Sequence, residues 1–206
     1  MNPVETLRRI SESSSGRFPS FTEAHALKAL ELIGEGAGIG RQQLSRELGL
    51  GEGTVRTLLS RMKAAGLLET SRGGTTLTSK GHELLKRFGE LIPAGEVPET
   101  DATVGPRNYA ILVRGAGESV KKGIEQRDAA LIAGADGATT LVHDGDGLVM
   151  PGVEVEVDPS TAKHILDAFK PCRGDVVIIG SARDPLDAEI GAKSAALRLL
   201  ERMHDP

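Results

Sequence analysis

The segment from Arg41 to Gly81 constrains this chain most, because two short helical patterns, a tight turn and a polar β-hairpin follow one another within it. Leu44 and Leu48 lie four residues apart with polar residues between them, which predicts a short amphipathic helix. The sequence Gly49-Leu50-Gly51 then ends that pattern. This succession predicts a small helical unit with a hairpin attached to it.

A second helix is expected from about residue 53 to residue 65, with one apolar face and one polar face. The apolar face carries Val55, Leu58, Leu59 and Met62. The polar residues of this helix are Thr54, Arg56, Thr57, Ser60, Arg61 and Lys63. Because the apolar face must pack on a core, a basic and hydroxyl-rich surface is left facing water.

A β-hairpin should follow this helix over about residues 68–78. Gly66 is typical of a helix end, and Leu67-Leu68 predicts the start of a strand. Arg72-Gly73-Gly74 predicts the turn, after which residues 75–78 form the returning strand. The tip of the hairpin therefore carries an arginine.

The sequence GTVRTLLSRMKAAGLLE, followed by the hairpin and LTSKG, resembles the reading helix and wing of prokaryotic and archaeal winged-helix transcription regulators. The resemblance covers roughly residues 20 to 90 and implies an N-terminal winged helix-turn-helix whose reading helix enters the major groove of DNA. It further implies that bases or phosphates are contacted by Thr54, Arg56, Thr57 and Arg61. Arg72 would reach the minor groove or the backbone.

The chemistry of this surface agrees with that resemblance. Lys63 adds to the basic face, and an arginine can donate paired hydrogen bonds to guanine. We therefore expect a transcription regulator whose partner is double-stranded DNA. Exposed Arg and Lys side chains also form ordinary solvated surfaces, so a winged helix that serves as an adaptor between proteins is an alternative.

The charge is distributed unevenly along the chain. The net charge is −4, but residues 1–92 carry +3 and residues 93–206 carry −7. This asymmetry favours a DNA-binding domain joined to a domain with another role. Because +3 predicts only modest, salt-sensitive DNA affinity, we expect a homodimer that doubles the contacts.

The length of 206 residues suits two domains, which we place at residues 1–92 and 107–206 with a Pro-rich and acidic linker at 93–106. No stretch approaches the ~20 apolar residues of a membrane span, and the N-terminus lacks the apolar core of a signal peptide. A cytoplasmic protein without a membrane partner is expected. The single cysteine, Cys172, and five scattered histidines lack metal-ligand spacing, so we expect no metal and no cofactor.

Two more helices are expected before the helix-turn-helix pattern. Residues 20–23, Ser-Phe-Thr-Glu, have the spacing of a capping box in front of a helix over 24–33. Residues 3–12 predict either a short helix or a fraying terminus. The glycine-rich run at 34–41 matches neither the dinucleotide nor the phosphate-loop motif, which indicates a turn between helices.

The C-terminal half predicts an α/β sandwich in the order βαββαβα, for which a ferredoxin-like arrangement is one option. The expected strands are 109–113, 138–143, 148–150 and 176–179, and the expected helices are 119–126, 158–169 and 185–203. Residues 129–135 could extend the first of these helices or form another strand. This half resembles effector-sensing domains attached to regulators, and the whole chain resembles archaeal winged-helix proteins with an uncharacterised C-terminal α/β domain.

Two turns of this half suggest a binding site for a small anionic metabolite. The turn from residue 114 to residue 119 follows a strand, and it offers Arg114, Gly115, Gly117 and Ser119 to an anion. A second turn carries Arg183 and would face the same pocket if the two strands were neighbours at that edge. A simple strand-to-helix turn is the alternative.

No local constellation of nucleophile, acid and base is present, so we expect no enzymatic activity and no catalytic residues. A metabolic enzyme with an attached winged helix is the alternative, and it requires Arg114 and Arg183 to converge on a titratable group. Asp144 and Asp146 lie in a DGDG sequence, where aspartates are expected to form the turn rather than to act as an acid, a base or cation ligands.

Overall fold

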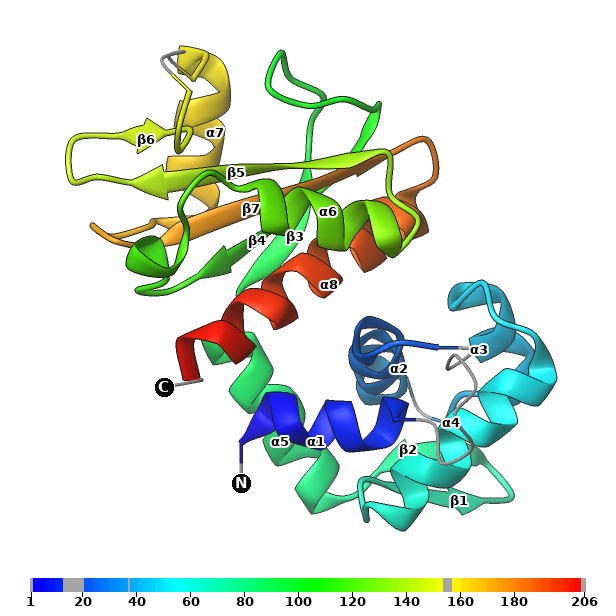
Figure 1. The fold of residues 1–206 in the computed structure, drawn as a ribbon. Helices are drawn as coiled ribbons and strands as arrows, with labels where there is room; N and C mark the ends of the chain where they lie inside the picture. The colour runs from blue at the N-terminus through cyan, green and yellow to red at the C-terminus, as the bar shows by residue number, and fades with distance from the viewer. Residues whose placement is uncertain (1, 13–20, 37, 154–156, 205–206) are drawn as a thin grey trace. The chain divides into compact units, whose positions relative to one another are not determined.

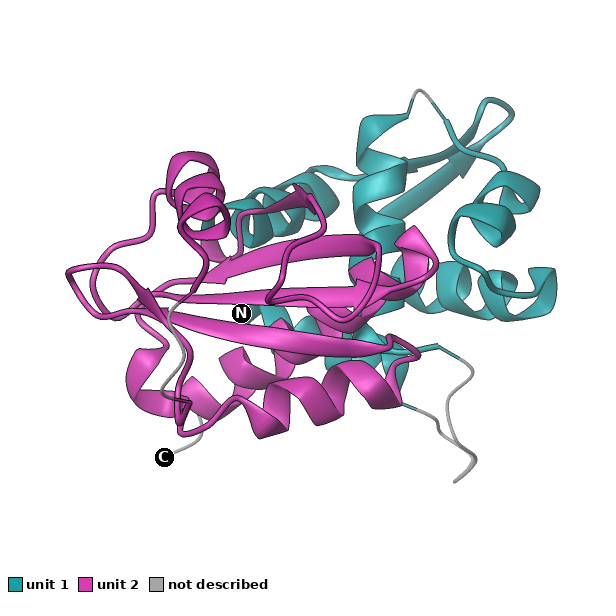
Figure 2. Ribbon diagram, turned by 90° about the horizontal axis from the view of Figure 1, so that it is seen from above, with its two compact units in different colours: residues 1–90 teal, residues 91–206 magenta. Residues whose placement is uncertain are grey.

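The computed structural model describes residues 2–12, 21–36, 38–153 and 157–204 (Figure 1). The chain divides into two compact units, unit 1 at Met1–Glu90 and unit 2 at Leu91–Pro206 (Figure 2). Helices and an antiparallel sheet of five strands make this an α+β protein. None of the helices in the described ranges is both long enough and apolar enough to cross a membrane.

In its described residues, unit 1 has five helices and one hairpin. Its elements are α1 (Pro3–Ser11), α2 (Glu23–Glu35), α3 (Arg41–Glu47), α4 (Glu52–Ala64), β1 (Leu68–Ser71), β2 (Gly74–Leu77) and α5 (Ser79–Leu91). The helices and the hairpin predicted between residues 41 and 78 are therefore present. The N-terminal segment is helical as well.

The spacing of apolar residues explains which helix faces are buried in unit 1. On α4, Val55, Leu58 and Met62 are completely buried, because residues three and four apart share one face of a helix. Leu59, which we expected on the same face, is only half-buried. The polar residues of α4 consequently lie on the side away from the core.

The glycine-rich run between α2 and α3 crosses the hairpin at its turn. Gly38 and Gly74 have φ values of +101° and +115°, and a Cβ on Gly38 would lie 2.1 Å from the carbonyl oxygen of Gly73. Only glycine permits this close approach of two backbones. It allows Ile39 to exchange backbone hydrogen bonds of 3.3 and 3.2 Å with Thr75, which form an isolated β-bridge between this run and β2.

Helix α2 begins with a capping box, although its members differ from those expected. Thr22 is the N-cap residue, and its backbone N–H donates to Nδ1 of His25 over 3.2 Å. His25 thus takes the role that the sequence pattern gave to Glu23, and Ser20 lies outside the described residues. A neutral imidazole is required there, because a protonated Nδ1 cannot accept a hydrogen bond.

The stability of α2 should therefore depend on pH. Burial lowers the pKa of His25 below its ordinary value of 6.5, so the folded protein favours the neutral ring. The contribution of this ring to stability is complete above the unfolded pKa of 6.5 and is lost as the pH falls through the lower folded pKa. We expect the free energy of unfolding, measured with urea at about pH 7.5 and about pH 5.5, to fall at the lower pH.

His25→Gln keeps an acceptor in the capping box but cannot titrate, so it should lose this part of the pH dependence. His25→Ala removes the cap and should lower the free energy of unfolding by about 1 kcal/mol at the higher pH. His82→Gln, on the exposed side of α5, is the matched control and should behave as the wild type. An unchanged pH dependence in His25→Gln would show that another group is responsible.

Unit 2 contains the five-stranded sheet, and its neighbouring strands are all antiparallel. The strands are β3 (Ala94–Val97), β4 (Arg107–Val113), β5 (Gly137–His143), β6 (Leu148–Val149) and β7 (Val176–Ala182), and their order is β3-β4-β7-β5-β6. The helices are the 3₁₀ turn η1 (Gly117–Ser119), α6 (Ile124–Ile132), α7 (Pro159–Phe169) and α8 (Pro185–His204).

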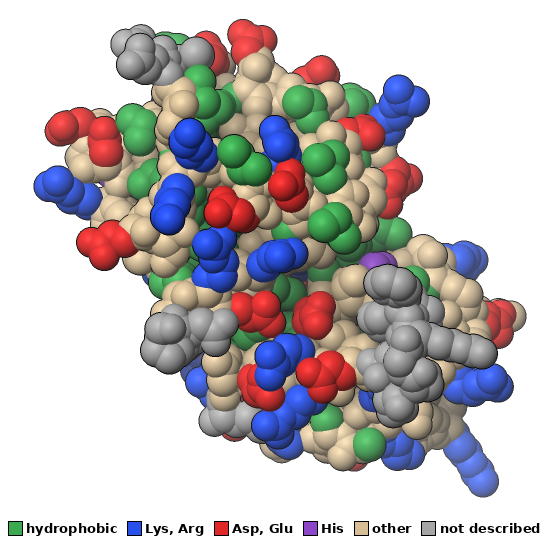
Figure 3. Space-filling model, viewed as in Figure 1, with side chains coloured by type: hydrophobic (Ala, Val, Ile, Leu, Met, Phe, Trp, Pro, Cys, Tyr) green, Lys and Arg blue, Asp and Glu red, His purple; other side chains and the backbone are tan. Residues whose placement is uncertain are grey.

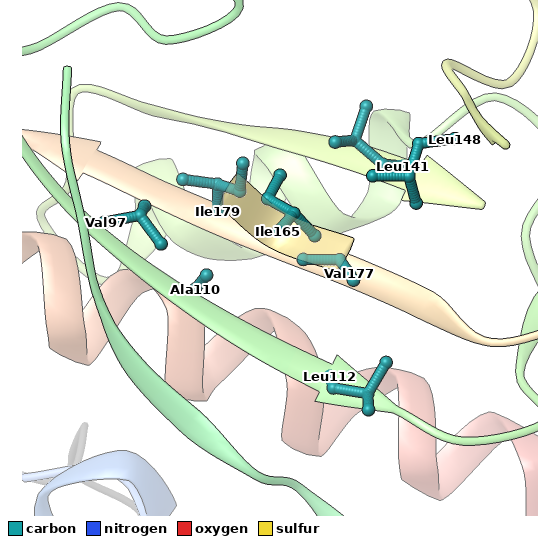
Figure 4. Packing of buried hydrophobic residues seen from close by; sticks show 8 residues of the cluster. All are labelled: Val97, Ala110, Leu112, Leu141, Leu148, Ile165, Val177 and Ile179. Carbon is teal, nitrogen blue, oxygen red and sulfur yellow. The ribbon is translucent and has the colours of Figure 1, made fainter. Parts of the chain in front are cut away.

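Both faces of this sheet are covered. Helices α6 and α8 lie on one face and α7 lies on the other (Figure 1). Between α7 and the sheet, apolar side chains from all five strands and from Ile165 form one cluster (Figure 4). Every residue of β7 is buried, as expected for the continuous apolar run of a central strand.

The sheet order shows that the ferredoxin-like option is wrong. In that arrangement the last strand of the βαββαβ unit lies at an edge, whereas here the last strand, β7, is central and pairs with both β4 and β5. The segment 93–106 is also more than a linker, because it contains β3, which pairs with β4 and buries Val97. Glycine and proline are unfavourable inside strands, so the sequence favoured a linker here and the four-residue edge strand was not predicted.

The helix expected at 119–126 begins later. Gly123 adopts a left-handed conformation with φ of +71°, which interrupts the chain before α6 starts at Ile124. The ambiguous stretch from residue 129 belongs to α6 as far as Ile132. Helix α7 begins where expected, because Asp158 caps it by accepting a hydrogen bond of 3.0 Å from the N–H of Thr161.

Candidate nucleic-acid interface

A hollow of about 400 Å³ lies on unit 1 between α4, the start of α3 and the hairpin. Arg56, Ser60 and Lys63 line it from α4, since residues four and seven positions apart share one helix face. Arg41 lines it from the first residue of α3, and Thr70 lines it from β1. With Thr75 of β2, three cationic and three hydroxyl-bearing residues therefore line one concave surface.

The elements that carry these side chains are positioned by the core of unit 1 and by a backbone bridge. The buried face of α4 fixes its polar face outward, and the bridge between Ile39 and Thr75 ties the start of α3 to the hairpin. No Asp or Glu lines the hollow. Arg41, Arg56 and Lys63 are exposed, and they form no ion pair with any residue in the described ranges. Among the described residues, no carboxylate therefore pairs with these three cations.

The other residues predicted to contact DNA are not among those that line this hollow. Thr57 is exposed on the first turns of α4, and its hydroxyl donates to the carbonyl oxygen of Gly53 over 3.1 Å. Thr54 is half-buried at the start of the same helix. Arg72 is exposed at the hairpin tip, where the hydroxyl of Ser71 accepts from the N–H of Gly73 over 3.1 Å and shapes the turn.

Arg61 has a different role from the one predicted. Its Nη1 donates to the carbonyl oxygens of Ile10, Ser11 and Glu12 over 3.0, 3.2 and 2.7 Å. Its guanidinium also lies 5.4 Å from the ring centre of Phe21. A cation is favourable beside the unpaired carbonyl groups at the C-terminus of a helix. Arg61, which belongs to α4, therefore stabilises the contact between α4 and the end of α1. The Nη1 group of Arg61 is therefore not free to contact DNA.

The turn from Arg114 to Ser119 holds an anion, but that anion is Asp175 of the same chain. The Asp175 carboxylate accepts from the N–H groups of Gly115 and Cys172, both over 2.8 Å, and lies 3.4 Å from Nη1 of Arg114. The N–H of Gly117 donates to the carbonyl oxygen of Gly174 over 2.8 Å. The N–H groups of Gly115, Gly117 and Ser119 are thus used within the fold, the last by donating to the carbonyl oxygen of Ala116 over 3.0 Å, whereas the Arg114 side chain is 51% exposed.

Arg183 does not lie near Arg114. Strands β4 and β7 are antiparallel, with Val113 opposite Val176 and Arg107 opposite Ala182. The residue after β4 and the residue after β7 consequently lie at opposite ends of the sheet, about 20 Å apart for strands of this length. The shared pocket, on which the enzyme alternative depended, is not formed.

The remaining candidates are the aspartates of the DGDG sequence and the residues that could bind a metal ion. Oδ1 of Asp144 accepts from the N–H groups of Asp146 and Gly147, both over 2.9 Å, which confirms the turn-forming role. These hydrogen bonds also lower the pKa of Asp144. Within the described ranges, His, Cys, Asp and Glu form no group of three that could hold a metal ion. Cys172 is an exposed free thiol.

Arg41 and Thr70 were not predicted from the sequence as members of the basic hollow. Ser60 and Lys63 could be found from their spacing to Arg56 on one helix. Arg41 and Thr70 come from other elements, and no local pattern relates them to α4. Their position depends on the packing of α3 and the hairpin against that helix.

The two units define a two-domain α+β protein with a basic hollow on its N-terminal unit. Residues 26–83 match the family model described as the PH0730-like N-terminal domain, and residues 104–199 match a domain of unknown function, DUF4443. The solved structure of the hypothetical protein PH0730 from Pyrococcus horikoshii OT3 is similar, with 31% sequence identity and a TM-score of 0.71. The similarity covers 90% of this chain and 96% of that chain. No curated protein matches the chain. The chain belongs to the PH0730-like family.

Proposed function

We propose that unit 1 is a winged helix-turn-helix that binds double-stranded DNA, with α4 as the reading helix and the hairpin as the wing. The basic hollow between α4 and the hairpin is the observation that carries this proposal. A DNA backbone that passes beside a helix in the major groove would meet cations and hydroxyls there, which are the groups that hold phosphates.

The order of elements in unit 1 supports the same reading. Helices α3 and α4 are joined by a turn in which Gly49 has a φ of +61°, and the hairpin follows α4 directly. Arg56 and Thr57 lie on the exposed side of the first turns of α4, the part of a reading helix that reaches base edges. Arg72 at the hairpin tip would contact the backbone or the minor groove.

In the cell, this activity would be that of a transcription regulator. Unit 2 would supply dimerisation or the sensing of a small ligand, because paired reading helices double the contacts of a modestly charged unit. The homodimer would bind a site with two half-sites.

The test is DNA binding by Arg56→Ala/Lys63→Ala, which removes two cations of the hollow without touching the core. Fluorescence anisotropy with duplexes selected from genomic DNA should show a loss of affinity of about tenfold or more. The dependence of log K on log salt should become shallower by about one to two units, since fewer counterions are released.

The matched control is Lys86→Ala/Arg127→Ala, which removes the same charges from exposed helix positions outside the hollow. It should bind DNA as the wild type does. Wild-type binding that does not weaken with salt, or equal losses in both double variants, would contradict the proposal and favour a protein-binding adaptor.

A further inference from the structure

A second groove of unit 1, of about 360 Å³, lies between α1, the end of α4 and the start of α5. Its floor is apolar and includes Ile10, Ala64 and Ala65. Its charged lining residues are Glu5, Arg9, Arg61 and Lys80. The groove shares no lining residue with the basic hollow. Its volume lies at the lower end of the range for small-molecule pockets.

The charges around this groove are not balanced. Glu5 pairs with Arg8 over 2.7 Å and with Arg9 over 2.9 Å, so the one carboxylate of the groove is already neutralised. Figure 3 shows such mixed charges on the face of unit 1 that carries α1. Arg61 and Lys80 have no carboxylate partner in the described part of the chain.

These two cations are held in place by carbonyl groups. Nζ of Lys80 donates to the carbonyl oxygen of Ala65 over 2.7 Å, which keeps the ammonium at the end of α4. Arg61 uses only Nη1 for the carbonyls of α1, and its Nε and Nη2 meet no acceptor among the described residues. Nε and Nη2 form the edge of a guanidinium that can donate two parallel hydrogen bonds to the two oxygens of a carboxylate.

We propose that this groove binds a small organic anion that joins a carboxylate to an apolar chain or ring. The carboxylate pairs with Arg61 and Lys80, and the apolar part covers Ile10, Ala64 and Ala65. Charge complementarity selects the carboxylate, and the apolar floor selects against strongly hydrated anions such as free phosphate.

Such a ligand would touch α1 and α4 at the same time and would strengthen their contact through Arg61. Because α4 carries the basic hollow, the ligand would also affect DNA binding; this consequence alone rests on the proposed function. The binding site itself can be tested without DNA.

The test uses the ¹⁵N-labelled full chain with octanoate, phenylacetate and the neutral analogue octanamide. We expect octanoate or phenylacetate at about 1 mM to shift the backbone N–H signals of Ile10, Ala64 and Ala65. Octanamide should bind at least about tenfold more weakly, because it lacks the charge that pairs with Arg61 and Lys80.

Two variants localise the site. Lys80→Gln can still donate to the carbonyl of Ala65 but has no charge, and it should weaken octanoate binding about tenfold, which corresponds to about 1.4 kcal/mol. Ala64→Leu fills the groove from an exposed helix position and should abolish the shifts. Lys86→Gln, which lies on α5 outside the groove, should bind octanoate as the wild type does.

Equal binding of octanoate and octanamide would overturn the proposal. So would shifts confined to other residues, unaltered binding in Ala64→Leu, or the absence of shifts with both carboxylates. None of these outcomes depends on whether unit 1 binds DNA, so failure of this site and failure of the DNA-binding proposal are distinguishable.

Discussion

Replacing Gly180 by alanine should lower the free energy of unfolding of unit 2 by at least about 3 kcal/mol. Gly180 lies in the central strand β7 and faces α8. A Cβ at this position would lie 2.3 Å from the carbonyl oxygen of Ala188 and 2.7 Å from the backbone nitrogen of Ala192. Because both atoms belong to the helix backbone, α8 would have to move away from the sheet.

Urea unfolding followed by circular dichroism measures this loss, with Gly147→Ala as the control. Gly147 also lies in unit 2, but nothing stands within 4 Å of the position of its Cβ, and its φ is not in the left-handed region. This control should stay within about 0.5 kcal/mol of the wild type. If Gly180→Ala were equally stable, α8 could not lie as close to β7 as the structure places it.

Replacing Asp175 by alanine should lower the free energy of unfolding by about 2 to 4 kcal/mol. The carboxylate is 7% exposed and accepts hydrogen bonds from the backbone of Gly115 and of Cys172. Its removal leaves two N–H groups without an acceptor and Arg114 without its partner. The turn after β4 and the turn before β7 would then lose the group that joins them.

Asp146→Ala is the matched control, since it removes an exposed carboxylate from the neighbouring hairpin turn. It should change the melting temperature by less than about 2 °C. Formate should partly restore the stability of Asp175→Ala and leave the wild type unchanged, because it can occupy the vacated anion position. A variant as stable as the wild type would show that these turns hold together without the carboxylate.

The Asp175 contacts also explain why a glycine-rich turn beside an arginine is a weak indication of a ligand site. The pattern Arg114-Gly115-Ala116-Gly117 does bind an anion, as its backbone geometry predicts. The sequence pattern does not reveal that the anion lies 60 residues away in the same chain. Such a pattern indicates that the turn binds an anionic group, but it does not indicate whether that group belongs to a ligand or to the same chain.

The position of Arg61 illustrates the same limit in unit 1. Its spacing on α4 placed it among the basic residues of that helix. Its guanidinium instead donates hydrogen bonds to the carbonyl oxygens at the end of α1, about 50 residues earlier in the chain. It also lines the groove for which we propose an organic anion. The variant Arg61→Ala would thus change the packing of α1, and it is unsuitable as a test of DNA contact.

Local patterns alone determined the helices and the hairpin between residues 41 and 78, the start of α7 at Asp158, and the DGDG turn. Each of these depends on side-chain periodicity, capping or turn geometry within a few residues, so the sequence contains the whole cause. The central apolar strand was predictable for the same reason, whereas the sequence left residues 3–12 open between a short helix and a fraying terminus.

Only the tertiary structure decided the order of the sheet, the partner of Arg61, the occupant of the Arg114 turn and the presence of Arg41 in the basic hollow. These features join segments that are far apart in the chain. Strand order is set by which apolar surfaces are buried together, and the use of a charged group is set by the carbonyls and carboxylates that packing brings within hydrogen-bonding distance. Neither is a property of any short stretch of sequence.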